Sequence, residues 1–252
     1  MPQGNKEFEF GLLKILCDPK RNSIDIGAGK GDYSEEMIKY SAYVFAYEPL
    51  PIEIQTLEKK FAKSKISVKV IALSNFSGRT ILYTPGYSKS EKGSLYGWSS
   101  IVQDFDKLKK KYPDIFPEIY KQEISTSTLD DERISNVGFI KIDVEGAELE
   151  VLIGGKRTIN ESKPSILIEI EERHRQGSTK LVPEFLKKSG YDGFYFSNEK
   201  LFQIDTFLIE EHQWKKELPG QKHPEGKHYI NNFIFIRKDN ERAIKELKTS
   251  TK

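Results

Sequence analysis

A glycine-rich turn is the first feature of the chain whose residue types and spacing suit ligand chemistry. It runs from Asp25 to Asp32 and places Gly27, Gly29 and Gly31 at alternate positions. Glycines between a strand and a helix let the backbone approach a ligand and supply N–H donors at the helix N-terminus. The spacing departs from the G-x-G-x-x-G of dinucleotide sites, because Asp32 stands where the last glycine would fall. Asp25 suits a cationic group better than a pyrophosphate, so the turn favours S-adenosylmethionine, with its ammonium and sulfonium. The alternative is an ordinary structural turn.

A second carboxylate, Glu48, ends the next predicted strand, 21 residues after Gly27. A carboxylate at that point accepts hydrogen bonds from two ribose hydroxyls, in nicotinamide cofactors as well, so Glu48 predicts a nucleoside without choosing which. Pro49 and Tyr33, which neighbour these residues in the chain, are assigned to the same cofactor site. Ser74 or Asn75, at the end of the third predicted strand, would bond the polar edge of adenine. The alternatives are a surface acid at Glu48 and local turn bonds at Ser74 and Asn75.

A third group of charged residues alternates along a later predicted strand, at Lys141, Asp143 and Glu145. Alternation puts the three side chains on one side of the strand, at its carboxyl end, where open α/β sheets bind ligands. A neutral hydroxyl is a poor nucleophile, so a base that removes its proton helps methyl transfer. Asp143 and Glu145 are candidate bases, Asp143 also borders the cofactor, and Lys141 would orient them or stabilise alkoxide charge. The alternative is a buried ion-pair network.

The following predicted strand adds Glu169 and His174 near the same edge. An imidazole with an unperturbed pKa near 6.5 suits a general base at neutral pH. The alternative for His174 is an ordinary surface residue. The carboxylates and the histidine match no metal-binding spacing, so no metal is expected. The base is therefore Asp143, Glu145 or His174.

An aromatic and hydroxyl cluster lies in the middle of the chain, at Tyr96, Trp98, Ser99 and Ser100. Beside a catalytic site it would suit a sugar, whose ring faces pack on aromatic side chains and whose hydroxyls bond to serine. An equally good interpretation is a hydrophobic anchor that pins this segment to the body.

The order of predicted elements indicates how these residues are positioned. Strands alternate with helices in the first and last thirds of the chain, which predicts a parallel sheet with helices on both faces. The predicted strands are 22–26, 42–47, 66–73, 137–144, 165–170, 191–196 and 232–236, with 78–84 as a candidate for a further short strand. The predicted helices are 32–40, 51–62, 102–111, 147–153 and 179–188. The last two strands have the alternation of an antiparallel edge pair. The expected architecture is thus an α/β fold with about seven strands.

The whole chain, 1–252, is interpreted as one domain with two irregular parts. Residues 85–123 break the alternation of strands and helices and predict an insertion on the substrate side, since a segment this long in a compact domain is usually functional or disordered. Residues 239–252 are highly charged and predict a frayed tail.

The charge balance excludes little by itself. Forty Lys and Arg stand against 38 Asp and Glu, for a net charge of +2, so there is no whole-chain argument for a nucleic acid partner. No apolar run approaches the roughly 18 residues of a membrane span, and residues 1–10 have no apolar signal region. Cys17 is the only cysteine, which fits a reducing compartment. We therefore expect a cytoplasmic protein without a membrane span, and a homodimer is possible.

The block from Phe139 to Glu148, FIKIDVEGAE, followed by Val151-Leu152 and Gly154, resembles the signature of FkbM-type S-adenosylmethionine-dependent methyltransferases. The resemblance extends in order from Ile24 to Ile236. It includes the glycine turn, Glu48-Pro49, Ala72-Leu73-Ser74 with Gly78, Thr128-Leu129-Asp130, Pro164 to Glu169, Gly190-Tyr191 and Asn232 to Phe235. It implies a class I methyltransferase (Rossmann-like) fold. It also implies methyl transfer to oxygen, typically a hydroxyl of a sugar or natural product. The insertion over 85–123 departs from the family pattern, at the place where substrate contacts usually lie.

The predicted function is therefore S-adenosylmethionine-dependent O-methylation of a hydroxyl on a saccharide or a natural-product-like small molecule. An NAD(P)-dependent oxidoreductase is the first alternative, since it shares the fold and Glu48. It lacks the third glycine at the required spacing and has no Tyr-x-x-x-Lys hydride-transfer signature. A non-catalytic nucleoside-binding module is the second alternative.

Overall fold

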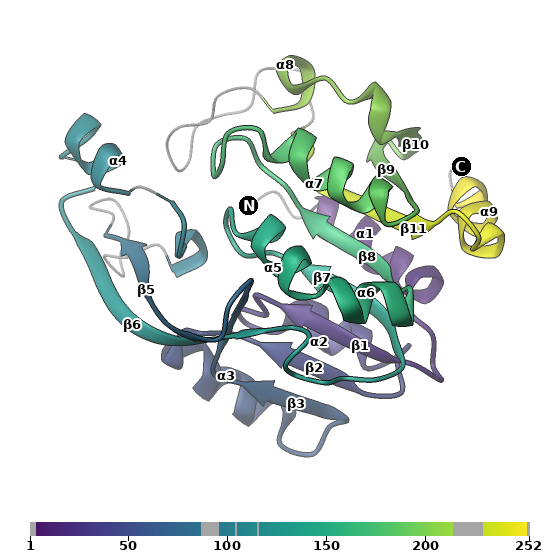
Figure 1. Cartoon of the computed structure of the whole chain (residues 1–252), viewed down its shortest axis with the longest axis horizontal. Helices are drawn as coiled ribbons and strands as arrows, with labels where there is room; N and C mark the ends of the chain where they lie inside the picture. Colours follow the sequence, from purple (N-terminus) through teal and green to yellow (C-terminus); the bar gives the residue numbers. More distant parts are fainter. Residues whose placement is uncertain (1–3, 87–95, 104, 115, 214–228, 251–252) are drawn as a thin grey trace.

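A computed structural model of the chain describes residues 4–86, 96–103, 105–114, 116–213 and 229–250 (Figure 1). The strands are β1 Asn22–Ile26, β2 Val44–Tyr47, β3 Ile66–Lys69, β4 Ala72–Ser74, β5 Gly78–Pro85, β6 Ile119–Thr128, β7 Val137–Ile142, β8 Ser165–Glu169, β9 Tyr191–Ser197, β10 Lys200–Gln203 and β11 Asn232–Arg237. The helices are α1 Gly4–Leu16, α2 Asp32–Met37, α3 Pro51–Phe61, α4 Phe105–Lys111, α5 Glu148–Gly154, α6 Lys156–Ser162, α7 Ser178–Lys188, α8 Ile209–His212 and α9 Glu241–Thr249, with short 3-10 turns η1 Tyr96–Trp98 and η2 Ile204–Thr206.

The principal sheet has the strand order β10-β9-β11-β8-β7-β1-β2-β3 in the described residues. The five strands from β8 to β3 are mutually parallel, whereas β11 runs antiparallel to both β8 and β9. This confirms the α/β fold expected from the order of elements and the class I methyltransferase fold that the resemblance implied. The sheet has eight strands rather than about seven, because β10 pairs with β9 at the edge in a hairpin that the sequence pattern did not indicate.

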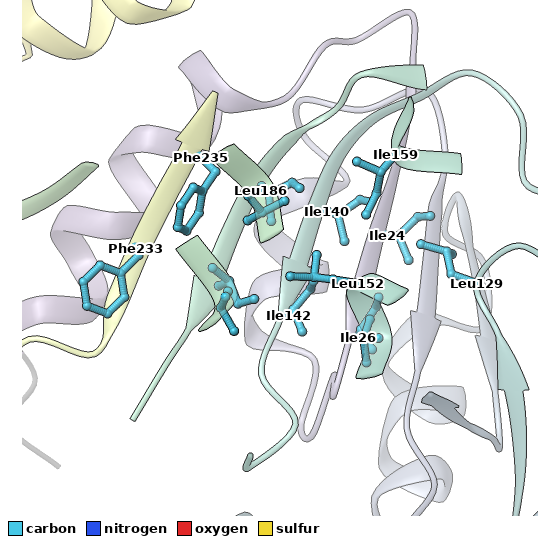
Figure 2. Close-up of a cluster of buried hydrophobic side chains, with 14 of the residues drawn as sticks. Ile24, Ile26, Leu129, Ile140, Ile142, Leu152, Ile159, Leu186, Phe233 and Phe235 are labelled. Carbon is cyan, nitrogen blue, oxygen red and sulfur yellow. The ribbon is translucent and has the colours of Figure 1, made fainter. Parts of the chain in front are cut away.

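Helices cover both faces of this sheet. Successive side chains of each strand point to opposite faces, and apolar side chains lie on both. Ile24, Ile140 and Ile166 belong to the face that packs against α5, α6 and α7, as Figure 2 shows for part of this core. Phe139 and Leu167 belong to the opposite face, which packs against α1, α2 and α9. Each fully buried side chain of this kind contributes about 1.5–3 kcal/mol relative to an exposed one. The two apolar layers thereby fix the carboxyl ends of β1, β7 and β8 at one common edge.

A separate three-stranded sheet, β4-β6-β5, stands beside the principal one. β5 and β6 form a long antiparallel ribbon, from Gly78 paired with Thr126 to Pro85 paired with Ile119. The ribbon extends away from the principal sheet toward α4 (Figure 1). The predicted insertion, 85–123, begins at the last residue of β5, but its predicted end at 123 lies inside β6.

The predicted third strand, 66–73, is wrong as a single element. β3 ends at Lys69 in the principal sheet, and β4 begins at Ala72 and pairs with β6 in the other sheet. Between them Val70 is exposed, so the chain crosses from one sheet to the other there. Six of the eight residues in this run are apolar and none is Gly or Pro, which is why its pattern gave no sign of the break.

The predicted frayed tail is also wrong over most of its length. Residues 241–249 form α9, whose Ala243 and Leu247 are buried one helical turn apart beside Leu12, Leu13 and Leu16 of α1. The side chain of Asn240 caps the helix by accepting from Ala243 N at 3.2 Å. The charged residues that suggested a tail occupy the outer face of an amphipathic helix. In the part of the chain that the structure describes, no helix is both long enough and apolar enough to span a bilayer.

Candidate functional site

The glycine turn joins β1 to α2 and uses its three glycines in different ways. Gly27 has a φ of 75°, and a Cβ there would lie 1.8 Å from the backbone oxygen of Asp143. Gly31 has a φ of 77°, and a Cβ there would lie 2.5 Å from Leu57 of α3. Gly29 has a φ of 52°, but a Cβ there would meet no atom within 4 Å. Packing therefore requires Gly27 and Gly31, whereas Gly29 borders open space that a ligand can occupy.

Glu48 follows β2 and holds the turn from the side. Its Oε2 accepts from Gly29 N and its Oε1 from Leu50 N, each at 2.9 Å. Burial raises the pKa of Glu48 to about 7, although the two backbone donors act in the opposite direction. The carboxylate thus lies beside Gly29, at the end of the strand where the sequence predicted a ribose contact. Pro49 is partly buried next to it.

Asp25 lies at the end of β1 and is fully buried. Its Oδ2 accepts from Ser34 Oγ of α2 at 2.6 Å, whereas Oδ1 accepts no hydrogen bond from any described residue. The nearest cation to Oδ1 is the Nζ of Lys141, at 3.9 Å. Burial raises the pKa of Asp25 more than Lys141 and Ser34 lower it. A buried acceptor without a donor is costly, so Oδ1 is an atom that a bound donor would satisfy.

Lys141 is the buried cation at the centre of the group. It is the register partner of Asp25 on the neighbouring strand β7. Its Nζ lies 3.1 Å from Asp143 Oδ2 and 4.8 Å from the ring centroid of Tyr33. Burial would lower the pKa of Lys141, but the charges of Asp143 and Asp25 outweigh it and raise the pKa. The side chain of Asp143 is 29% exposed, so it is the member of this pair that a ligand can reach.

A second pair lies where the chain leaves β7 and β8. Glu145 Oε2 and His174 Nε2 are 3.0 Å apart, and neither atom has another partner among the described residues. The side chain of Glu145 is 17% exposed and that of His174 is 3% exposed. Burial raises the pKa of Glu145. Burial lowers that of His174, but the charges of Glu145 and Glu171 outweigh it and raise the pKa. Glu145 also has a φ of 54°, a left-handed conformation that is uncommon for a non-glycine residue.

Glu169 completes the edge at the end of β8. Its Oε1 accepts from Asn231 Nδ2 at 2.7 Å. Burial, followed by the charges of Asp143 and Glu171, raises the pKa of Glu169 well above its ordinary value. Glu171 itself is held by Arg173 and Tyr229. The structure therefore brings Lys141, Asp143 and Glu169 together around one strand edge, with Glu145 and His174 beside them.

The aromatic and hydroxyl cluster reaches this edge through two contacts. Ser100 Oγ donates to the backbone oxygen of Glu145 at 2.6 Å. The guanidinium of Arg173 lies 4.8 Å from the ring centroid of Trp98. Ser99 pairs instead with Thr84 of β5 at 2.7 Å, and the side chain of Tyr96 lies outside the described residues. The segment is thus anchored to the site by Ser100 and Trp98.

Ser74 ends β4 and Asn75 follows it, and β4 belongs to the smaller sheet. The premise that these two residues lie at the end of a strand of the principal sheet, facing adenine, is therefore wrong. Ser74 is buried in β4, where its backbone oxygen lies 2.0 Å from the position of a Cβ on Gly154 of α5. Asn75 is exposed. Their contact with a cofactor remains a prediction.

Sequence reasoning missed several residues of this region. Glu148 accepts from Gly146 N at 2.8 Å, and burial raises its pKa to about 7. Glu9 of α1 accepts from the hydroxyl of Tyr33, and Asn231 holds Glu169. Glu148 belongs to the FIKIDVEGAE block, which was a signal. Glu9 and Asn231 are distant from that block in the sequence, and no sequence pattern marks them as site residues.

A hollow of about 480 Å³ lies at the opposite edge of the sheet and contains no candidate site residue. Its lining includes Arg21, Arg133 and Arg157 together with Glu161. Open parallel sheets bind ligands at the carboxyl ends of their strands, so the candidate site is the edge described above. In the described residues, no group of three or more His, Cys, Asp or Glu is arranged to hold a metal ion.

The mostly parallel sheet, with a glycine turn after β1 and an acidic strand edge after β7, has the class I methyltransferase fold. Residues 25–192 match the Methyltransferase FkbM domain, and the chain belongs to this family. A search of the curated proteins gave no match.

Comparison with solved structures gives fold similarity at low sequence identity. The crystal structure of a methyltransferase FkbM from Methylobacillus flagellatus KT is 19% identical, with a TM-score of 0.52 over 86% of this chain. The chain spans only 44% of that protein. A precorrin-6y C5,15-methyltransferase from Geobacter metallireducens is 14% identical, covers 93% of this chain and 88% of its own, and has a TM-score of 0.47. A putative methyltransferase from Streptococcus mutans, solved with S-adenosylhomocysteine, is 9% identical over 93% and 99% of the two chains, with a TM-score of 0.45.

Proposed function

We propose that the protein is an S-adenosylmethionine-dependent O-methyltransferase that acts on a hydroxyl group of a saccharide or a natural-product-like small molecule. Membership of the FkbM methyltransferase family supports methyl transfer. The observation that carries the choice of oxygen is the 3.0 Å pair of Glu145 and His174 beside Asp143. A hydroxyl needs a proton acceptor when it attacks a methyl group, and this pair provides one at the edge where ligands bind.

The residues present fit the cofactor. The carboxyl groups of Asp25, Asp143 and Glu169 lie around the ammonium of Lys141, and a cationic ligand would favour their ionised forms. The unsatisfied Oδ1 of Asp25 and the open space at Gly29 are further observations in favour. The full set of residues proposed to hold the cofactor is Asp25, Gly27, Gly29, Gly31, Tyr33, Glu48, Pro49 and Asp143, with Ser74 and Asn75 as weaker candidates.

S-adenosylmethionine, when bound, supplies an electrophilic methyl group on a sulfonium centre. The chain's own contribution begins with Glu48, whose carboxylate can accept from ribose hydroxyls while it keeps its two backbone donors. Asp143 and Lys141 then orient the reacting groups, and Lys141 is a fixed positive charge that stabilises a developing alkoxide. Positioning of this kind supplies most of the acceleration in a transfer that needs in-line geometry.

Glu145 is the member of the pair that takes the acceptor's proton in this proposal. Its side chain is 17% exposed, against 3% for His174, so the acceptor can reach Glu145 directly. His174 is the positioning residue behind it. The contact with His174 and the bond from Ser100 to its backbone hold Glu145 in its left-handed conformation. Glu169 lies at the same edge, where the side chain of Asn231 holds it.

The segment with Trp98 and Ser99 is proposed to form a wall of the acceptor site. Trp98 already stacks with Arg173, and an aromatic face beside carboxylates and hydroxyls suits a polyhydroxylated ligand. Cytoplasmic location and a possible homodimer remain part of the proposal.

The test is a calorimetric titration of the purified protein with S-adenosylhomocysteine, with NAD as the control ligand. We expect micromolar binding of the first and none of the second. The Glu48→Ala variant should weaken the binding at least ten-fold. Binding of NAD alone would support the oxidoreductase alternative, and binding of neither would support a role without this cofactor. A screen of hydroxylated acceptors, beginning with sugars, follows a positive result.

A further inference from the structure

Helix α1 contributes a carboxylate to the site from outside the residues that match the family. Glu9 lies before residue 25, where the match begins. Its Oε2 accepts a hydrogen bond from the hydroxyl of Tyr33 at 2.7 Å, and this bond joins α1 to α2. Glu9 is partly buried, so the bond is shielded from competition with water.

The ring of Tyr33 is held on two sides. Its hydroxyl end is fixed by Glu9, and the ring of Phe10 packs edge-on at 4.9 Å with an interplanar angle of 85°. Its face carries the ammonium of Lys141, with Nζ 4.8 Å from the ring centroid. A rotation of the ring therefore changes the surroundings of that ammonium directly.

Lys141 links the ring of Tyr33 to the strand edge where the cofactor is proposed to bind. Its Nζ lies 3.1 Å from Asp143 Oδ2 and 3.5 Å from the backbone oxygen of Gly27. Asp143 and Gly27 belong to the two segments that border the proposed cofactor site. The ammonium is thus shared between the Tyr33 ring, the glycine turn and the carboxylate that a ligand can reach.

We propose that Glu9 is a positioning residue for cofactor binding, and that it acts through its hydrogen bond to Tyr33 on Lys141 and Asp143. The proposal rests on the proposed function, because the bound ligand is S-adenosylmethionine. In this proposal Glu9 affects cofactor binding through its hydrogen bond to Tyr33 and not through its charge. The charges that act most on Lys141 are those of Asp143, at 3.1 Å, and Asp25, at 3.9 Å, so the direct charge effect of Glu9 on Lys141 is weaker.

An effect through the hydrogen bond and an effect through the charge predict different results for two substitutions of Glu9. Glu9→Gln removes the charge and keeps a carbonyl oxygen that accepts from Tyr33. Glu9→Leu removes both. Tyr33→Phe removes the same hydrogen bond from the other side by deleting one oxygen. Lys14→Leu is the matched control, because Lys14 is exposed on the same helix.

The experiment measures the dissociation constant of S-adenosylmethionine by calorimetry for the full-length wild type and each variant. Circular dichroism and thermal unfolding establish that each variant is folded. We expect Glu9→Leu and Tyr33→Phe to weaken binding by roughly three- to ten-fold, the range that one hydrogen bond supports. Glu9→Gln and Lys14→Leu should stay within two-fold of wild type. The double variant Glu9→Leu/Tyr33→Phe should be no weaker than either single variant.

Several results would overturn the proposal. Wild-type affinity in Glu9→Leu or in Tyr33→Phe would show that the hydrogen bond between Glu9 and Tyr33 does not support cofactor binding. Equal losses in Glu9→Gln and Glu9→Leu would assign the effect to charge. Additive losses in the double variant would mean that the two residues act separately. If Glu9→Leu does not fold, Tyr33→Phe together with Glu9→Gln decides the question. A wild-type protein that binds no S-adenosylmethionine would instead overturn the proposed function, and this inference with it.

Discussion

The Nε2 atom of His174 and the Oε2 atom of Glu145 lie 3.0 Å apart, although 29 positions separate the residues in sequence. Each residue follows the end of a neighbouring parallel strand, β7 for Glu145 and β8 for His174. The two residues therefore meet because their strands end at the same edge of the sheet, which brings the two following loops into contact. Because the side chain of His174 is only 3% exposed, Glu145 is the member of the pair that we propose as the base.

Glu145→Gln should lower turnover by about 10²–10⁴-fold, because it removes the proton acceptor. Its affinity for S-adenosylmethionine should stay within a few-fold of wild type, because the substitution does not touch the glycine turn or Glu48. The measurement is methyl transfer to an acceptor found in the screen, together with calorimetry for the cofactor. Glu150→Gln is the control, since Glu150 lies nearby and pairs with Arg175. Unchanged turnover in Glu145→Gln would exclude this residue as the base.

Cofactor affinity should depend on pH through Glu48. The pKa of this carboxyl is about 7 without ligand, and ribose hydroxyls favour its ionised form. Binding should therefore release protons, and affinity should rise between pH 6 and pH 8 and level off above the pKa. Below it the loss should approach about ten-fold per pH unit.

The variant Glu48→Gln isolates this contribution from other titrating groups. It should bind more weakly at pH 8 and show a flatter pH profile than wild type. A profile in Glu48→Gln that is as steep as that of wild type would place the titrating group elsewhere, for example at Asp25.

Alanine substitutions in the glycine turn should separate packing from ligand access. Gly27→Ala would force a Cβ to within 1.8 Å of the Asp143 backbone, so we expect it to destabilise the fold or prevent folding. Gly29→Ala meets no protein atom and should cost only about 1–2 kcal/mol for its left-handed backbone.

Gly29→Ala should nevertheless lose most affinity for the cofactor, because its methyl group points into the open space beside Glu48. Urea unfolding and calorimetry on the two variants check both expectations. Full cofactor binding by Gly29→Ala would show that the ligand does not approach this part of the turn.

Glu171→Gln should destabilise the protein in a pH-dependent way. Burial alone would raise the pKa of Glu171, but His174 and Arg173 lower it to about 2, compared with 4.5 in the unfolded chain. A carboxylate with a lowered pKa contributes stability above pH 4.5 and loses it as the pH falls toward 2. We expect the variant to be less stable than wild type by about 2 kcal/mol at neutral pH, the scale of hydrogen bonds to charged groups.

The difference between wild type and Glu171→Gln should shrink as the pH is lowered from 5 toward 3. Urea unfolding at several pH values measures it. Glu172→Gln, one position along the chain, is the comparison outside the Arg173 pair. A constant difference across this range would mean that the charge of Glu171 does not contribute.

Local chemistry explains which parts could be predicted from sequence. The glycine turn, Glu48 and the strand with Lys141, Asp143 and Glu145 are each recognisable within ten residues, because glycine conformation and strand alternation are local properties. The charged face of α9 concealed a helix whose burial depends on α1. The β5–β6 ribbon depends on pairing between residues 78 and 126, which no local pattern records.

Tyr33 shows the same limit within the site. Its place after the glycine turn predicted a cofactor contact, and its ring does lie against Lys141. Its hydroxyl is taken by Glu9, which comes from a helix that the sequence pattern did not indicate. The direction of a side chain is decided by the element packed against it, so Glu9 could be found only once α1 was placed.

The ribbon of β5 and β6 is rooted in its own small sheet, apart from the strands that carry Asp25, Lys141 and Glu169. Its outer end can therefore lengthen, shorten or change composition without altering the register of the catalytic edge. We therefore expect the choice of acceptor to depend on this segment and not on the strands of the principal sheet. Transplanting residues 86–118 between family members should transfer preference for an acceptor while the donor half of the reaction stays intact.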